Sequence, residues 1–167
     1  LADQLVSAEI RDERDGAVAR DALLAVGDES GAAVAEIIRA EADAFAEAVK
    51  KRSRTAVEEV LRYIRETVDK LVALPVPIIA AINGLAFGGG AELAVRCDMR
   101  VMDPGAVICF SEVRLGLMPD WGGGVALSRL LGRSLAAELI LTARRVSADE
   151  ALGMGLVNRI SKPGKSL

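Results

Sequence analysis

The pattern of apolar and polar positions divides the chain near residue 74. Before that point, apolar residues recur at helical spacing along one face, and polar residues fill the positions between them. The apolar face consists of Val57, Val60, Leu61, Ile64, Val68, Leu71 and Val72. Pro75 and Pro77 then end the helix, because proline lacks the N–H group that a helix interior requires. We therefore predict a mainly helical N-terminal segment over residues 1–74, whose apolar face packs on a core or, alternatively, binds a partner.

After residue 75 the pattern changes to short apolar runs separated by glycine-rich turns and helical stretches. The runs typical of buried strands are IIAAIN (78–83), MRVMD (99–103), AVICF (106–110) and LVNRI (156–160). The stretches typical of helices end near residue 96, cover 125–131 and 135–141, and begin once more after Ser147, which has capping-box spacing to Glu150. Strands that alternate with helices predict an α/β core with a largely parallel sheet over residues 75–167.

Composition narrows the class of protein. Of the 167 residues 51% are apolar, which is enough for a substantial core, and the net charge of −3 with interspersed signs gives no indication of nucleic-acid binding. We expect a soluble cytoplasmic protein, because the sequence shows neither a run of eighteen apolar residues nor a basic-then-apolar leader. Cys97 and Cys109 lack metal-site and CxxC spacing, so we expect buried, reduced thiols.

The absence of histidine limits the chemistry that the chain can perform. Ser-His-Asp and Cys-His catalysis and most zinc sites are excluded, which leaves carboxylates and backbone N–H groups. In INGLAFGGGAELAVRCD (82–98), three consecutive glycines lead into a helix with Glu92 in its first turn. Free N–H groups at such a helix start bind anions, or stabilise an oxyanion that forms during a reaction. The alternative is a tight turn in which Glu92 merely complements the helix dipole.

A second acid, Glu112, follows the predicted strand AVICF, where the chain leaves a sheet at its carboxyl end. Strand ends of this kind line the active-site crevice of α/β folds. The alternative is an exposed loop glutamate that pairs with Arg114. Two glutamates near one glycine-built anion site would form an acid–base pair, and burial would raise their pKa values toward neutral pH.

Three segments resemble, in order, the enoyl-CoA hydratase/isomerase (crotonase) superfamily between Leu74 and Ile160. They are PVPIIAAINGLAFGGGAELAVRCDMRV, AVICFSEVRLGLMPDWGGGVALSRLLG and AAELILTARRVSADEALGMGLVNRI. The resemblance implies a partial crotonase-like ββα superhelix core. The loop that supplies the second oxyanion donor and much of the adenine pocket in the family has no counterpart in residues 1–74. Residues 123–125 read Gly-Gly-Val where the family usually has Gly-Gly-Thr.

The resemblance also implies roles for individual residues. Glu92 and Glu112 match the catalytic glutamates of the family, and Gly89 matches the oxyanion-hole N–H. Residues expected to bind the substrate are Leu85, Phe87, Gly88, Gly90, Ser111, Asp120 and Trp121. For Leu85 and Phe87 a place in the hydrophobic core is the alternative. No metal is expected, and coenzyme A enters only as part of the substrate.

Three functions remain open at this point. The first is a lyase of fatty acid metabolism that catalyses the syn hydration of a 2-enoyl-CoA thioester. This enzyme would be a homotrimer or hexamer and would bind neither nucleic acid nor membrane. The second is an enoyl- or dienoyl-CoA isomerase, and the third is a non-catalytic crotonase-like scaffold. The paired glutamates favour hydration, because isomerases of the family often keep one carboxylate or carry Asp at the position of Glu92.

Overall fold

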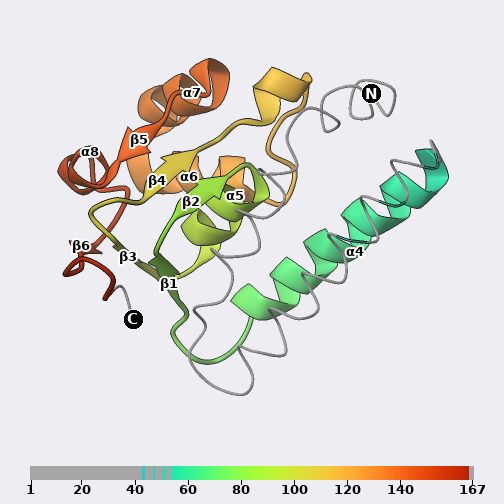
Figure 1. Cartoon of the computed structure of the whole chain (residues 1–167). Helices are drawn as coiled ribbons and strands as arrows, with labels where there is room; N and C mark the ends of the chain where they lie inside the picture. The colour runs from blue at the N-terminus through green and yellow to red at the C-terminus, as the bar shows by residue number, and fades with distance from the viewer. Residues whose placement is uncertain (1–42, 44–46, 48–50, 52–53, 166–167) are drawn as a thin grey trace.

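The computed structural model describes residues 43, 47, 51 and 54–165 (Figure 1). Apart from those three single residues, the part of the predicted helical segment before Arg54 lies outside the described residues. The helices are α4 (Arg54–Val72), α5 (Gly89–Arg96), the short 3₁₀ helix η1 (Glu112–Leu115), α6 (Gly123–Leu131), α7 (Arg133–Thr142) and α8 (Ala148–Gly153). The strands are β1 (Ile79–Ile82), β2 (Leu85–Phe87), β3 (Met99–Met102), β4 (Val107–Cys109), β5 (Val146–Ser147) and β6 (Arg159–Ile160).

The described strands form two three-stranded sheets. The first has the order β1–β3–β6 and is parallel throughout, with Ile79 opposite Met99. The second has the order β2–β4–β5, in which β2 and β4 are parallel and β4 and β5 are antiparallel. The predicted α/β class and the predominance of parallel pairing are confirmed, although the strands divide between two sheets.

The strands β1 to β4 belong alternately to the first and the second sheet. β1 passes through the corner at Asn83 and Gly84 into β2, which leads into α5, and β3 then passes into β4, which leads into η1 and α6. The Gly84 carbonyl accepts a hydrogen bond from Val107 N at 3.0 Å, so the two turns are joined at the corner. Each turn adds a strand to each sheet and then a helix, which is the predicted ββα arrangement. The sequence patterns do not predict β2 and β5, because runs of three and two residues are too short to show a periodicity.

The apolar face of α4 packs as predicted. Ile64, Val68 and Leu71 are buried against Ile78 of the segment before β1 and against the side of α5. Burying a side chain of this size contributes about 1.5–3 kcal/mol, so three of them hold α4 firmly against the core. α4 therefore lies beside α5 (Figure 1).

The end of α5 is anchored by a buried arginine from the neighbouring strand. The Arg100 guanidinium on β3 is 4% exposed and donates to the carbonyl oxygens of Cys97 at 2.7 Å and Leu156 at 2.8 Å. A cation at the carbonyl end of a helix also complements the helix dipole. α5 is therefore held in place at the end opposite its glycine-rich start.

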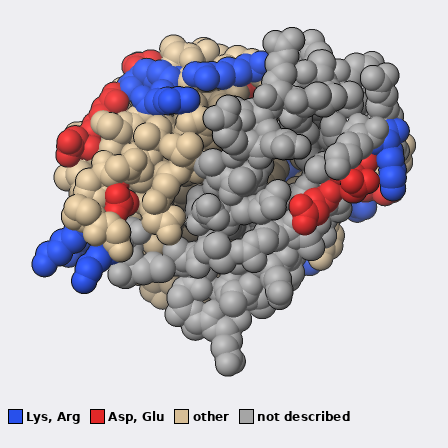
Figure 2. Space-filling view, in the orientation of Figure 1, with Lys and Arg blue, Asp and Glu red and all other residues tan. Residues whose placement is uncertain are grey.

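The surface agrees with the balanced composition. On the face that Figure 2 shows, basic and acidic side chains of the described residues both lie among uncharged ones. Cys97 and Cys109 are buried free thiols, as expected. Within the described part of the chain, no helix is long and apolar enough to cross a membrane.

Candidate active site

The glycine turn between β2 and α5 is shaped by Gly88. Gly88 has a φ of 52°, a left-handed conformation that glycine adopts without the steric cost of a Cβ atom. Its N–H donates to the Cys109 carbonyl at 2.9 Å, which ties the turn to the end of β4. A Cβ atom at Gly88 would lie 3.4 Å from Ser111 Oγ and 3.9 Å from Glu112 Oε1. The residues that follow β4 therefore lie directly against the turn.

The start of α5 presents backbone N–H groups that its own helix does not use. Gly89 is the first residue of the helix, and the first N–H groups of an α-helix have no acceptor within it. The positive end of the helix dipole adds to their attraction for negative charge. A Cβ atom at Gly90 would meet no described atom within 4 Å, so the backbone there is open to approach. The turn has the features that oxyanion stabilisation requires.

Gly89 also permits a close contact with Trp121. A Cβ atom at Gly89 would lie 2.4 Å from two carbons of the Trp121 ring, so only glycine allows the indole to lie against the turn. On its other side Trp121 packs against the cluster that α4 forms with α5. Trp121 therefore fills the space between the start of α5 and α4.

Glu92 is buried on α5 and is held by three backbone N–H groups. Its Oε2 accepts hydrogen bonds from Trp121 N and Gly123 N, both at 2.9 Å, and its Oε1 accepts one from Asp120 N at 3.2 Å. Gly123 is the first residue of α6, so the carboxylate also lies at the positive end of that helix. A Cβ atom at Gly123 would lie 2.5 Å from Glu92 Cγ, and glycine is therefore required for the contact.

Burial raises the pKa of Glu92 from its usual 4.5 to about 7, although the hydrogen bonds from Gly123 and Trp121 lower it. The negative charges of Glu112 and Asp120 raise the pKa further. The interaction with Glu112 shows that the two glutamates lie close enough to affect each other's ionisation. A carboxyl group with a pKa near neutral is suited to exchange protons at physiological pH.

Glu112 differs from Glu92 in its hydrogen bonding. It begins η1, is 9% exposed, and both of its carboxylate oxygens are buried with no hydrogen-bond partner among the described residues. Burial raises its pKa, while its own N–H group and the Glu92 side chain lower it without meeting the geometry of a hydrogen bond. The alternative pairing with Arg114 is not formed, since the Arg114 guanidinium donates to the Ala143 carbonyl at 2.7 Å. A buried acid that lacks partners costs stability, and such groups are concentrated at functional sites.

The remaining predicted residues lie at different distances from this pair. Leu85 and Phe87 are half-buried on β2, and Arg145 lies over the Phe87 ring at 5.4 Å. The Asp120 carboxylate pairs with Arg65 of α4 at 3.2 Å, so its N–H group and not its side chain serves Glu92. Within the described residues, no group of three or more His, Cys, Asp or Glu side chains is arranged to hold a metal ion.

Two contributors to the site have no local signal in the sequence. Gly123 supplies an N–H group to Glu92 from 31 residues away. Arg96 of α5 donates to the Trp121 carbonyl, and so contacts the same loop that holds Glu92. The glycine run at 122–124 is visible in the sequence, but nothing in it indicates which N–H groups face a carboxylate.

Comparison with known proteins identifies the family to which the chain belongs. Residues 28–164 match the family model of enoyl-CoA hydratase/isomerase, and the chain belongs to that family. The match begins well before Leu74, so the family pattern reaches into the N-terminal segment, where the motifs alone indicate no counterpart.

Individual relatives agree with this assignment. The chain is 45% identical to a putative enoyl-CoA hydratase/isomerase, YngF, of Bacillus subtilis (strain 168) over 69% of this chain and 45% of that protein. A solved enoyl-CoA hydratase from Bacillus anthracis is 42% identical with a TM-score of 0.64 over 66% of this chain and 43% of its own. A putative enoyl-CoA hydratase from Thermobifida fusca, solved in complex with acetoacetyl-CoA, is 36% identical with a TM-score of 0.61 over 66% and 43%. The crotonase-like fold is confirmed, and the chain spans less than half the length of these relatives.

Proposed function

We propose that the protein is an acyl-CoA-processing lyase that adds water across the double bond of a 2-enoyl-CoA thioester. One observation carries the proposal: two buried glutamates with different hydrogen bonding lie beside a glycine turn that begins a helix. The binding of acetoacetyl-CoA by the relative from Thermobifida fusca supports a thioester as the substrate class.

The difference in hydrogen bonding supports different roles for the two glutamates. Three N–H groups stabilise the ionised form of Glu92, which suits it to be the base. Glu112 accepts no hydrogen bond from the described residues, which favours the neutral form that an acid requires. Glu92 takes a proton from water as the water oxygen bonds to the β-carbon, and the thioester carbonyl becomes an enolate oxygen. Glu112 then protonates the α-carbon on the same face, and the proton on Glu92 passes to Glu112, directly or through solvent, which restores both groups.

The glycine turn acts on the enolate. The Gly89 N–H would donate to the thioester oxygen as negative charge develops on it, with Gly88 and Gly90 permitting the approach. One such donor contributes about 3 kcal/mol to stabilising the transition state. Ser111 and Trp121 lie against this turn, and the half-buried Leu85 and Phe87 belong to the strand that leads into it; we expect these four side chains to contact the acyl group. Coenzyme A takes part only as a portion of the substrate, and the scheme needs no metal.

The assembly and its setting follow the family resemblance. We propose a homotrimer or hexamer that works in the cytoplasm in fatty acid metabolism, and light scattering after gel filtration would test the subunit number. An isomerase is the second candidate, since the family comprises hydratases and isomerases. Moving a double bond requires proton transfer between carbons but no water, and one carboxylate suffices for that.

The decisive experiment measures hydration of crotonyl-CoA by the loss of enoyl-thioester absorbance. The chain is compared with Glu92→Gln, Glu112→Gln and the control Glu66→Gln, an exposed glutamate of α4. Loss of turnover in both site variants but not in the control is expected. Turnover of a 3-enoyl-CoA but not of crotonyl-CoA would favour the isomerase, and neither turnover nor acyl-CoA binding by calorimetry would favour the scaffold.

A further inference from the structure

We propose that Arg96 is a positioning residue: its guanidinium, braced by Asp69, holds the 120–123 loop in the orientation that aims its N–H groups at Glu92. The effect on rate rests on the proposed function, whereas the effect on Glu92 does not. Arg96 lies four residues after Glu92, so both side chains project from the same side of α5. Neither the glutamate motifs nor the family resemblance points to Arg96.

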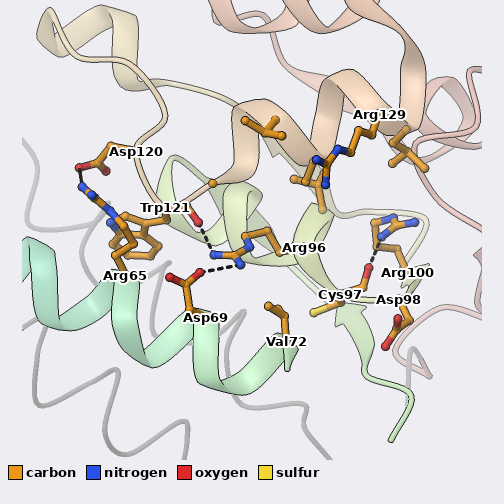
Figure 3. A pocket seen from close by; sticks show the side chains of 15 residues that line it. Arg65, Asp69, Val72, Arg96, Cys97, Asp98, Arg100, Asp120, Trp121 and Arg129 are labelled. Carbon is orange, nitrogen blue, oxygen red and sulfur yellow. Dashed lines mark hydrogen bonds and ion pairs between the residues drawn. The ribbon is translucent and has the colours of Figure 1, made fainter. Parts of the chain in front are cut away.

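The arginine joins two elements that are distant in sequence. Arg96 Nη2 lies 2.7 Å from Asp69 Oδ1 on α4, and Arg96 Nη1 donates to the Trp121 carbonyl at 2.6 Å. Figure 3 shows the guanidinium between these two oxygens, at the wall of a pocket of about 680 Å³ that other residues of α4, α5 and α6 also line. Glu92 and Glu112 are not among the residues that line this pocket. Arg96 therefore contacts the loop at the wall of a pocket that the two glutamates do not line.

Trp121 is held on both sides of its backbone. Its carbonyl accepts from Arg96, while its N–H donates to Glu92 Oε2 at 2.9 Å. Two side chains one helical turn apart on α5 thus fix a single loop residue. The orientation of that N–H depends on the peptide planes around Trp121, and the carbonyl contact is one of the restraints on them.

Gly122 provides a second, independent sign that the loop is built around the guanidinium. Its φ is 88°, and a Cβ atom there would lie 3.2–3.3 Å from three atoms of the Arg96 guanidinium. Gly122 is also the N-cap of α6 and directly precedes Gly123, another donor to Glu92. The guanidinium therefore packs against the very backbone that turns the chain into α6.

Arg96 is more buried than the Arg65–Asp120 ion pair, which also connects α4 to the loop. The Arg96 side chain is 14% exposed, whereas its partner Asp69 is 57% exposed, and the Arg65–Asp120 pair is 50% and 43% exposed. A charge-assisted hydrogen bond from a mostly buried guanidinium is strong, whereas exposed ion pairs contribute little. We therefore expect the Arg96–Trp121 contact to dominate, with Asp69 orienting the guanidinium.

The ionisation of Glu92 reports on this contact. The charged groups that bear on it are Glu112 from η1 and Asp120 from the loop. On α4, Arg65 pairs with Asp120, and Asp69 pairs with Arg96 itself. Loosening the loop weakens N–H bonds that favour the ionised carboxylate, so the pKa of Glu92 rises. If Glu92 is the base, the acid limb of the pH–rate profile then moves to higher pH.

The test compares Arg96→Met with Arg96→Lys and with Arg129→Met, an exposed arginine of α6 that lines the same pocket. For Arg96→Met we expect the apparent pKa of the acid limb in the pH profile of kcat to rise by about one unit, because about one N–H bond to the carboxylate is lost. KM should change by less than about twofold. Arg96→Lys should restore part of the shift, and Arg129→Met should leave the profile unchanged. An unchanged profile in Arg96→Met, or an equal shift in Arg129→Met, overturns the proposal.

A second readout separates this inference from the proposed function. The carboxyl carbon of Glu92 is titrated by NMR in ¹³C-glutamate-labelled protein, and its resonance is assigned by its absence in Glu92→Gln. A higher Glu92 pKa in Arg96→Met supports the positioning role even if no acyl-CoA is hydrated, and an equal pKa overturns it even if hydration is found. If Arg96→Met does not fold, the same titration is carried out on Asp69→Asn and Arg96→Lys. A raised Glu92 pKa in either variant supports the positioning role, and an unchanged Glu92 pKa in both overturns it.

Discussion

Glu92 and Glu112 are two buried carboxyl groups at one site, but their surroundings differ. Glu92 lies at the start of α6, with three N–H groups on its oxygens, whereas Glu112 lies at the start of η1, where its oxygens meet no donor among the described residues. Burial raises the pKa of both. The comparison teaches that burial raises the pKa of a carboxyl group, while hydrogen-bond donors on its oxygens favour the ionised form.

The largest effect is expected from replacing each glutamate. Glu92→Gln and Glu112→Gln should each lower kcat by about 10²- to 10⁴-fold, the usual contribution of a general acid or base. Their effects on stability at pH 8 should have opposite signs. Glu92→Gln turns an amide NH₂ toward N–H donors and should destabilise by about 1–3 kcal/mol. Glu112→Gln removes an unpartnered buried charge and should be neutral or stabilising, as urea unfolding will measure.

Destabilisation by both substitutions in equal measure would contradict the comparison. It would mean that Glu112 has a hydrogen-bonded environment like that of Glu92. Glu66→Gln on the exposed surface of α4 serves as the control for both variants, since it should change neither the rate nor the stability.

The pH dependence of stability should show the next largest effect. A carboxyl whose pKa is raised from 4.5 to about 7 on folding binds its proton more tightly in the folded state. Its contribution to stability is therefore full below pH 4.5 and is lost as pH rises toward 7, by about 3 kcal/mol at 1.36 kcal/mol per unit. Urea unfolding at pH 5 and pH 8 should show this loss in the chain and a reduced loss in Glu92→Gln. Equal losses in both would show that Glu92 does not carry the raised pKa.

A methyl group at α6 should disturb Glu92 selectively. Gly123→Ala places a Cβ atom 2.5–2.7 Å from Cα, Cβ and Cγ of Glu92, and should destabilise by about 1–3 kcal/mol and lower turnover. Gly124→Ala is the matched control, because its Cβ atom would make only ordinary contacts of 3.7 and 3.8 Å with Pro119 and Ile140. Thermal unfolding and crotonyl-CoA turnover compare the two. Similar results for both would refute the close packing of α6 on Glu92.

The smallest effect is expected at Asp120, whose N–H serves Glu92 while its side chain does not. Asp120→Asn keeps the N–H group and breaks only an ion pair with Arg65 that is 50% and 43% exposed. Stability should change by less than about 0.5 kcal/mol, and kcat by less than about twofold. A loss of turnover comparable to that of Glu112→Gln would instead make Asp120 a third catalytic carboxylate.

Much of the fold is predictable from local patterns. The apolar face of α4 is buried as its periodicity indicates, and the runs at 78–83, 99–103 and 106–110 contain β1, β3 and β4. Ser147 caps α8 as its spacing to Glu150 predicts, with Glu150 N donating to Ser147 Oγ at 3.4 Å. β2 and β5 are missed because short strands depend on their neighbours for hydrogen bonds and carry little periodicity of their own.

The candidate site, like the fold, is predicted from the sequence only in part. Glu92 and Glu112 are conspicuous in the sequence because one follows a glycine turn and the other follows a strand, and the structure brings both to that turn. The family match from residue 28 extends beyond the motifs, because a family pattern sums weak preferences that no single motif contains.

The sequence by itself determined the longer helices, the strands β1, β3 and β4, and the placement of the acids next to a glycine turn and a strand end, since these depend on residues close together in the chain. Tertiary structure alone decided how each acid is surrounded. The N–H groups on Glu92 come from 28 to 31 residues away, and Arg96 meets its carboxylate partner on another helix. Every residue but proline carries the same N–H group, so the sequence holds no mark of which ones will converge. Their positions follow from the packing of α4, α5 and α6, and that packing gives two similar glutamates different environments.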